Sequence, residues 1–243
     1  MDIEKEIIIT KILKNCAGNK DRIIDLKKIA DELGIPEKQV VKTVNWLMSK
    51  DIPISLNLEK KYLISITTNL FDFLFSLFNK LGFSLTKIVR YLSWNDFERY
   101  ISEVLQKFDF QTYVNFRISV NKMRREVDII AKRDNLILCI DAKHWNKRIT
   151  QSVLLKIVEK QKERCRLIAK SPYELFKIFR DLMYYDNVYL VPIIIELFES
   201  KTNFIDGVYV IPWIAINEFL LAFEVADTNL WKISIDPQKY KLL

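Results

Sequence analysis

Three runs of β-prone residues in the middle of the chain constrain its fold more than any other feature. They span Phe110–Val120, Arg125–Lys132 and Asn135–Lys143. Only Arg133 and Asp134 separate the last two runs, a length typical of a two-residue β-hairpin turn. Because side chains alternate along a strand, this turn predicts which residues share each face of the sheet.

The predicted hairpin separates apolar from charged side chains. In its register Lys132 pairs with Asn135, and Asp128 pairs with Cys139. The first face is apolar and carries Val127, Ile129, Ala131, Leu136, Leu138 and Ile140. The second face carries Asp128, Asp141 and Lys143. A slip by one residue would bury these charges and expose the aliphatic side chains, so the pattern itself opposes such a slip.

A third carboxylate is expected from the helix that precedes these strands. Ser93 and Asp96 form an S-x-x-D capping pattern, which predicts a helix beginning at Trp94. Glu98 lies on the edge of the apolar stripe of this helix, beside Ile101. A carboxylate that leans into an apolar face needs a cation, a hydrogen-bond donor or a metal ion as its partner.

Such a group of carboxylates and a lysine has a definite chemical use. Hard divalent cations such as Mg²⁺ prefer oxygen ligands. An ion held there activates water and neutralises charge on a phosphodiester, and a neighbouring lysine stabilises the anion that develops. None of this requires histidine, and the chain has only one, His144, which we interpret as a structural residue or a phosphate contact.

The same residues resemble the PD-(D/E)XK, or restriction-endonuclease-like, nuclease superfamily. The resemblance rests on Glu98, on Asp128 in "REVDII" and on Asp141-x-Lys143 in "CIDAKHW", and it covers about residues 93–212. It is greatest with archaeal and bacterial Mrr-like restriction endonucleases and weaker with Holliday-junction resolvases, whose basic, Gly-containing helix start is absent here. Val127 also stands where the family name has proline.

The resemblance implies an α/β fold, namely a restriction-endonuclease-like mixed β-sheet flanked by helices. It implies that Glu98, Asp128 and Asp141 bind Mg²⁺, which Mn²⁺ can replace, while Lys143 assists attack on DNA. The products would carry 5′-phosphate and 3′-hydroxyl ends. A homodimer is expected, because cutting both strands with one site per chain takes two chains.

A long helix is predicted over Ile149–Ala169, and Gln161 is the polar member of its inner stripe. In several nuclease families of this fold a polar residue on this helix approaches the metal, so Gln161 is a further catalytic candidate. A glutamine that is satisfied at a packing interface is the alternative. Lys156 and Lys160 on the same helix are candidate phosphate contacts.

The N-terminal part of the chain predicts a separate small domain. Helices are expected over residues 3–15 and Leu26–Leu33, followed by the turn Gly34-Ile35-Pro36 and a third helix. The segment "IADELGIPEKQVVKTVNWL" resembles a winged helix-turn-helix domain that covers about the first 66 residues. In that family the exposed face of the third helix and the wing read DNA, which implies the set Lys38, Gln39, Lys42, Thr43, Lys60 and Lys61. A protein-docking role is the alternative.

Composition excludes several other classes of protein. The four glycines are not spaced for a Walker A loop or a dinucleotide-binding turn, and the three cysteines form no CxxC pair. The formal charge is +7, and the excess lies in the middle of the chain: net +5 over residues 67–148 and +4 over 149–185, against −4 over 186–243. A localised basic region favours a polyanion such as DNA as partner.

These observations predict three parts: a winged helix-turn-helix domain (1–66), a helical linker (67–92) and a nuclease domain (93–243). No segment predicts a membrane span or a signal peptide, so the cytoplasm is the expected location. Two other functions stay open. The chain could be a non-catalytic DNA-binding regulator, or an interaction module that docks through the apolar segment Leu70–Phe78.

Overall fold

The computed structural model describes residues 3–16, 23–57, 63–68, 70–83, 91, 93–120, 123–143, 150–197, 204–225 and 227–240. Lys60, Lys61 and His144 lie outside the described residues. The chain divides into two compact units, Met1–Phe97 and Glu98–Leu243, and the predicted linker falls inside the first. No helix among the described segments is both long and apolar enough to cross a bilayer.

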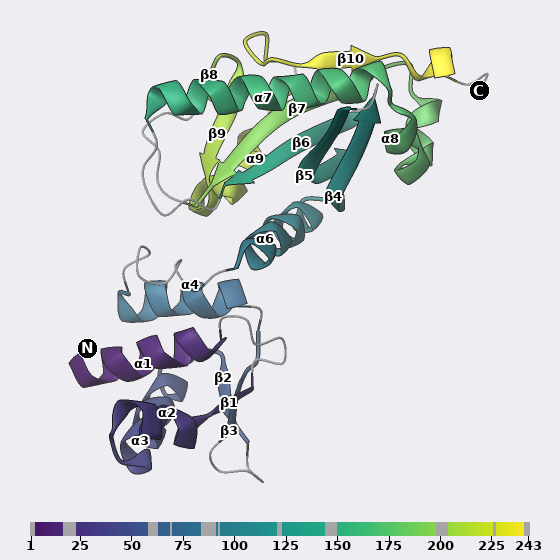
Figure 1. The fold of residues 1–243 in the computed structure, drawn as a ribbon. Helices are drawn as coiled ribbons and strands as arrows, with labels where there is room; N and C mark the ends of the chain where they lie inside the picture. The colour runs from purple at the N-terminus through teal and green to yellow at the C-terminus, as the bar shows by residue number, and fades with distance from the viewer. Residues whose placement is uncertain are drawn as a thin grey trace. The chain divides into compact units, whose positions relative to one another are not determined.

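The described residues of the first unit form helices and a small antiparallel sheet (Figure 1). Its elements in chain order are α1 (Ile3–Cys16), β1 (Ile23–Asp25), α2 (Leu26–Leu33), α3 (Glu37–Met48), β2 (Ile54–Leu56), β3 (Leu63–Ile66) and α4 (Leu70–Leu81). The sheet order is β1-β3-β2. The helices and the β2–β3 pair lie where the sequence predicts them, while the winged helix-turn-helix assignment itself stays a prediction.

Local chemistry accounts for the ends of α2. The Asp25 side chain accepts a hydrogen bond of 2.9 Å from the Lys27 N–H, which satisfies one free donor of the first turn. Gly34 ends the helix with φ 64°, a left-handed conformation that glycine adopts without steric cost. This stop lets α3 begin only three residues later, at Glu37.

The structure corrects the predicted DNA-reading face of α3 at one residue. Lys38 and Lys42 are exposed and Gln39 is half-buried, but Thr43 is buried. The Thr43 hydroxyl donates a hydrogen bond of 3.2 Å to the backbone oxygen of Gln39. Thr43 is therefore a core residue, because this bond within the helix satisfies its only strong polar group.

The second unit is built around a seven-stranded mixed sheet (Figure 1). Its main elements are α6 (Trp94–Lys107, which begins in the first unit), β4 (Gln111–Val120), β5 (Met123–Arg133), β6 (Leu136–Lys143), α7 (Gln151–Lys170), α8 (Tyr173–Ile178), β7 (Val188–Glu196), β8 (Phe204–Ile205), β9 (Val208–Pro212), α9 (Ile216–Ala222) and β10 (Ile233–Ile235). Short 3₁₀ turns lie at Arg180–Tyr184, Trp213–Ala215 and Pro237–Tyr240.

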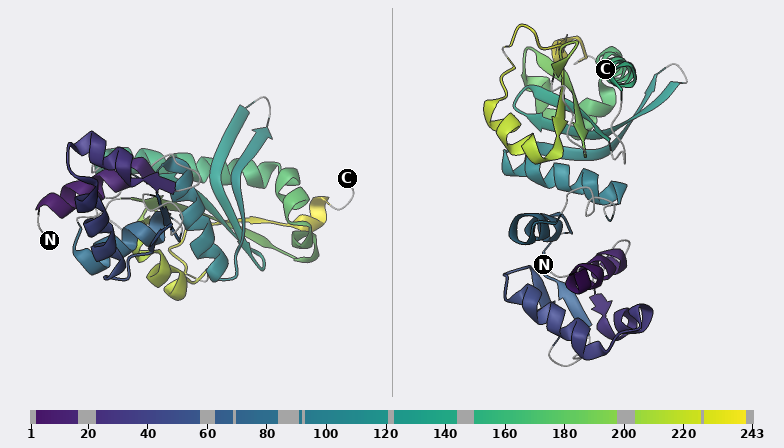
Figure 2. Two further views of the ribbon diagram at one scale, coloured as in Figure 1. Left: turned by 90° about the horizontal axis from the view of Figure 1, so that it is seen from below. Right: turned by 90° about the vertical axis from the view of Figure 1, so that its left-hand side faces the viewer.

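The strand order is β4-β5-β6-β7-β9-β8, with β10 paired to β7. The strands β4, β5 and β6 form an antiparallel meander, whereas β6, β7 and β9 are parallel. This mixed sheet, flanked by helices, fits the expected restriction-endonuclease-like fold. Figure 2 shows β4 and β5 extending beyond the rest of the sheet.

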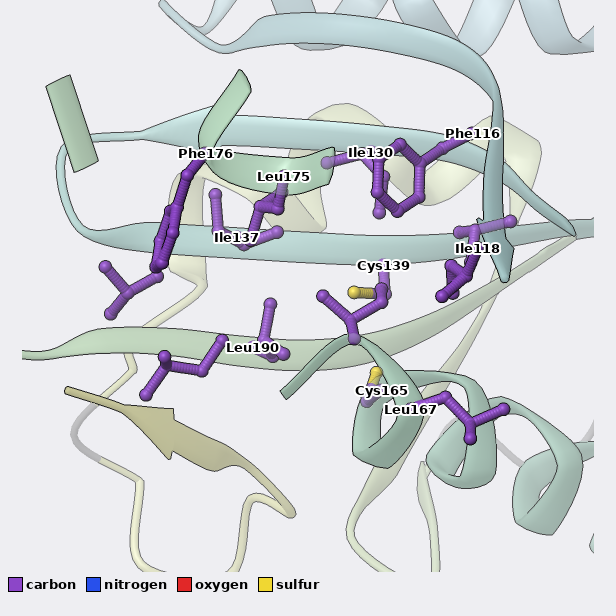
Figure 3. Close-up of a cluster of buried hydrophobic side chains, with 14 of the residues drawn as sticks. Phe116, Ile118, Ile130, Ile137, Cys139, Cys165, Leu167, Leu175, Phe176 and Leu190 are labelled. Carbon is purple, nitrogen blue, oxygen red and sulfur yellow. The ribbon is translucent and has the colours of Figure 1, made fainter. Parts of the chain in front are cut away.

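The core of the second unit lies between the sheet and the α7–α8 layer. Side chains of β5 and β6, including Ile130, Ile137 and Cys139, pack against Cys165 of α7 and Leu175 of α8 (Figure 3). The segment of α6 from Glu98 onward covers the other face of the sheet (Figure 1). There Ser102 Oγ and Thr112 Oγ1 are 2.6 Å apart.

The β5–β6 register differs from the predicted one by two residues. Arg133 pairs with Leu136, so the turn consists of Asp134 and Asn135. Asp134 takes φ 52°, a left-handed conformation that aspartate tolerates better than most residues. The turn therefore begins at Asp134, and Arg133 remains part of the strand. A shift by two keeps each paired side chain on its predicted face, because the side-chain period along a strand is two.

A break in the strand pairing overturns the predicted position of Val127. The β4–β5 register runs from Gln111↔Lys132 to Val120↔Met123 but skips Asn115 and Asp128, and Asn115 has φ 57°. Val127 belongs to the buried cluster with Ile130, on the α7 side, and does not share a face with Ile129. The irregularity at Asn115 and Asp128 interrupts the alternation on which the prediction depended.

Candidate active site

Asp128 stands at the break in the strand pairing, and its carboxylate is turned toward the neighbouring strand. Asp128 Oδ2 accepts a hydrogen bond of 2.8 Å from the backbone N–H of Ala142 on β6. The β5–β6 pairs end at Ile129↔Ile140, so this side-chain bond stands beyond the last pair. It holds the Asp128 carboxylate next to Asp141, the residue that precedes Ala142.

Asp141 is 1% exposed and is contacted by two cations. Its Oδ1 accepts a hydrogen bond of 2.7 Å from Arg164 Nη1 on α7. Its Oδ2 lies 2.7 Å from Lys143 Nζ in an ion pair, but it accepts no hydrogen bond of regular geometry from any described residue. The structure therefore brings Asp141 and Lys143 together on one face, as the alternation predicts.

The pKa of the Asp128 carboxyl reflects both its burial and the acidic groups near it. Burial, and next the negative charge of Asp141, raise the pKa of the Asp128 carboxyl from its ordinary value of 3.8 to about 7. Glu98 raises this pKa further, whereas the Ala142 N–H and the Lys143 charge lower it. The charges of Asp141 and Glu98 thus both act on Asp128, and a positive charge beside Asp128 would relieve this repulsion.

Glu98 occupies the place on α6 that the sequence predicts. It is 4% exposed and stands next to the buried Phe97. The helix begins at Trp94, as predicted, and this side chain is 40% exposed in its first turn. The capping pattern is present, since Ser93 Oγ accepts a hydrogen bond of 3.1 Å from the Asp96 N–H.

Gln161 is fully buried, and both ends of its amide are engaged by protein groups. Its Nε2 donates a hydrogen bond of 2.7 Å to the backbone oxygen of Cys139 on β6. Its Oε1 accepts a hydrogen bond of 2.7 Å from Arg164 Nη1, the same nitrogen that contacts Asp141. Gln161 therefore lies one contact away from Asp141 and positions Arg164.

Sequence reasoning missed Arg164 as a member of this site. The basic residues expected to matter on this helix, Lys156 and Lys160, are exposed on its outer surface. The available signal was spacing, because Arg164 follows Gln161 by three residues and so lies on the same side of the helix.

Glu196 is a second residue that the sequence analysis passed over. It is 4% exposed and pairs with Lys143 in the parallel β6–β7 register. The Leu197 N–H donates a hydrogen bond of 3.1 Å to the Lys143 backbone oxygen, which ties the two strand ends together. A single acidic residue at the end of the apolar run "VPIII" was the signal for it.

The donor set fits a hard divalent cation held by two carboxylates. Within the described residues, no group of three or more His, Cys, Asp and Glu side chains is close enough to enclose a metal ion. Mg²⁺ does not need such a cage, since proteins often bind it through one or two carboxylates together with water and substrate phosphates. Asp128 and the buried Asp141 Oδ2 supply oxygen ligands of that kind.

Comparison with known proteins gives a family match over part of this chain. Residues 88–166 match the family model of a restriction endonuclease, Mrr_cat. This range contains Glu98, Asp128, Asp141, Lys143 and Arg164, and the match supports the PD-(D/E)XK nuclease superfamily. The chain is also 27% identical over 139 residues to an uncharacterized protein from Archaeoglobus fulgidus, covering 56% of this chain and 97% of the relative.

A solved structure was matched as well, the crystal structure of protein VC1899 from Vibrio cholerae. The two chains are 12% identical, with a TM-score of 0.33, and the match covers 90% of this chain. This chain spans half the length of that protein.

Proposed function

We propose that this chain is a metal-dependent DNA endonuclease that hydrolyses phosphodiester bonds. The arrangement of Asp128, Asp141 and Lys143 carries the proposal. Burial, together with the Asp141 carboxylate on the adjacent strand, raises the pKa of Asp128 to about 7, and a lysine stands 2.7 Å from Asp141. Strongly perturbed carboxylates beside a specific cation are typical of functional sites.

Asp128 and Asp141 would hold Mg²⁺ or Mn²⁺, and the nearby charge of Glu98 on α6 would help to attract the ion. When bound, such an ion acts as a Lewis acid that lowers the pKa of water and neutralises phosphate charge. Ala142 contributes by fixing the Asp128 carboxylate through its N–H. Arg164 and Gln161 fix the Asp141 carboxylate from α7.

Lys143 has a separate task in this proposal. Its ammonium group cannot be a metal ligand while it is protonated, but it lies 2.7 Å from Asp141 Oδ2 and therefore close to any ion bound there. From that position it would donate a hydrogen bond to a phosphate oxygen or to the attacking oxygen. Such a preorganised donor stabilises the negative charge that develops in the transition state.

The surfaces that would hold DNA are basic and exposed. Lys156 and Lys160 lie exposed on α7. A pocket of about 560 Å³ at the extended β4–β5 hairpin is lined by residues that include Arg117, Arg124 and Arg125. Arg117 and Arg125 pair with acidic side chains, whereas Arg124 forms no ion pair with a described residue. Such cations contact phosphates without reading the base sequence.

The first unit would target the nuclease to DNA as a winged helix-turn-helix domain. Lys38 and Lys42 are exposed on α3, as a recognition helix requires, with Gln39 half-buried between them. We further propose that two chains act together, because one site per chain cuts one strand.

Asp141→Asn tests the proposal. The amide is nearly isosteric but uncharged, so it should abolish metal-dependent nicking of supercoiled plasmid while a gel shift without metal shows binding that is equal or stronger. The matched control is Asp134→Asn in the exposed β5–β6 turn, which changes the same charge and should cut like the wild type. Cutting that survives Asp141→Asn would place the active site elsewhere.

A non-catalytic DNA-binding regulator is the second candidate, and one observation favours it. Both oxygens of Asp141 already face cations, as they would in a purely structural ion cluster. Wild-type protein that binds DNA but never cuts duplex, branched or single-stranded substrates with Mg²⁺ or Mn²⁺ would support this alternative.

A further inference from the structure

Arg164 joins α7 to the centre of the candidate site through a continuous chain of hydrogen bonds. The Gln161 side chain donates a hydrogen bond from Nε2 to the Cys139 backbone oxygen and accepts one at Oε1 from Arg164 Nη1. The same Arg164 nitrogen donates a hydrogen bond to Asp141 Oδ1. Each of these three bonds is 2.7 Å long. Because Gln161 is fully buried and both ends of its amide are engaged, Arg164 is held in one place.

The position of Arg164 matters because Asp141 is almost fully buried. A buried carboxylate without a positive partner is strongly destabilising, so the metal-free protein needs a cation there. Lys143 contacts Oδ2 and Arg164 contacts Oδ1, so the two cations act on different oxygens of one carboxylate. Gln161 Oε1 also accepts a hydrogen bond from Arg164, which fixes the guanidinium beside Asp141.

We propose that Arg164 neutralises the charge of Asp141 in the metal-free protein and competes with the divalent ion for this carboxylate. This inference rests on the proposed function and deepens it, since it identifies what sets the metal affinity of the site. A guanidinium bonded directly to a metal ligand repels a divalent ion on the same carboxylate. Arg164 thus keeps the empty site folded and makes it bind metal weakly.

The test measures metal binding without DNA, so it does not depend on activity. Mn²⁺ and Mg²⁺ would be titrated by calorimetry at pH 8 into wild type, Arg164→Met and Arg164→Gln. We expect both variants to bind Mn²⁺ about fivefold or more tightly than wild type, because the competing charge is gone. Arg164→Gln retains a hydrogen-bond donor toward Asp141 and serves if Arg164→Met does not fold.

Thermal unfolding separates competition from a merely structural role. Both variants should melt below wild type without metal, since Asp141 loses a partner. The same saturating Mn²⁺ concentration should then raise their melting temperatures by more than it raises that of wild type, because stabilisation by a ligand grows with the logarithm of its concentration divided by Kd. A merely structural arginine would lower the melting temperature and leave the metal-induced rise unchanged.

The matched control is Arg166→Met on the same helix, where the side chain pairs with Glu159 at the exposed surface. It should leave the Mn²⁺ affinity unchanged. Suppose that wild type binds Mn²⁺ and cuts DNA, but that both Arg164 variants bind Mn²⁺ no more tightly than wild type. That result overturns this inference alone. Absence of Mn²⁺ binding in every variant and in wild type overturns the metal-dependent proposal together with it.

Discussion

The Asp128 carboxylate accepts a hydrogen bond of 2.8 Å from the backbone N–H of Ala142, although the last regular pair of these two strands is Ile129↔Ile140. This contact crosses from β5 to β6 and sets Asp128 beside Asp141. Burial, and next the charge of Asp141, raise the pKa of the Asp128 carboxyl to about 7, although the Ala142 N–H itself lowers it.

Lys143→Ala should abolish DNA cleavage without weakening metal binding. The lysine is proposed to stabilise developing negative charge, and its removal also takes a positive charge away from Asp141. Turnover should fall by about a hundredfold or more, measured by plasmid nicking, while Mn²⁺ affinity from calorimetry stays equal or rises. Lys177→Ala, which removes an exposed lysine paired with Glu174, is the control. Wild-type cutting by the Lys143 variant would remove this residue from the mechanism.

Asp128→Asn should make the metal-free protein more stable at pH 8. The folded-state pKa of about 7 lies above the ordinary 3.8, so between these values the folded protein retains a proton that the unfolded chain has lost. Wild-type stability therefore falls as pH rises from about 4 to 7. Asparagine cannot ionise and still offers an oxygen to Ala142. We expect a gain of about 1–3 kcal/mol in the free energy of unfolding at pH 8.

Urea unfolding in the presence of a chelator measures this gain, and the difference between the two proteins should shrink toward pH 3. Asp134→Asn, in the exposed turn, should show no such dependence on pH. An Asp128→Asn protein that is less stable than wild type at pH 8 would show that Asp128 is charged and well compensated in the folded state.

Glu98→Gln should weaken metal binding and slow cleavage while DNA binding without metal persists. The amide retains the shape of the side chain but loses the charge that would help hold the ion. A loss of about tenfold or more in turnover at limiting Mn²⁺ is expected, with partial recovery when Mn²⁺ is raised. Glu103→Gln on the same helix provides the matched control. Equal Mn²⁺ dependence in wild type and Glu98→Gln would leave Glu98 a structural residue.

The double variant Lys38→Ala/Lys42→Ala should bind duplex DNA more weakly and should still cut it at high enzyme concentration. Both lysines are exposed on α3, and each lost phosphate contact should lower the salt dependence of binding by about one unit of slope. Fluorescence anisotropy at several salt concentrations measures this. Lys14→Ala/Lys50→Ala changes the same net charge at exposed positions outside this face. Equal effects of the two double variants would count against a recognition role for α3.

Much of the second unit could be predicted from the sequence because apolar and polar side chains alternate strongly along its strands. The alternation along β6 placed Asp141 and Lys143 on one face although the predicted turn was wrong. An even shift of register does not change the face of a side chain, so the error of two residues had no effect on the site. Val127 was misplaced because alternation carries no sign of the irregularity at Asn115 and Asp128.

The N-terminal helices were also predictable, since Asp25, Gly34 and Pro36 act on the backbone next to them. Thr43 was not, because a hydroxyl counts as polar in a sequence pattern but can be satisfied by the backbone of its own helix.

Local sequence sets the helix ends and most strand faces, because short-range sterics and hydrogen bonding act along the chain. Tertiary packing is what brings Arg164 to Asp141, Gln161 to Cys139 and Glu196 beside Lys143. These contacts join residues more than 20 positions apart, across the α7–sheet interface and the parallel β6–β7 pair. Packing of elements that are distant in the chain brings such partners together, and no local pattern encodes it.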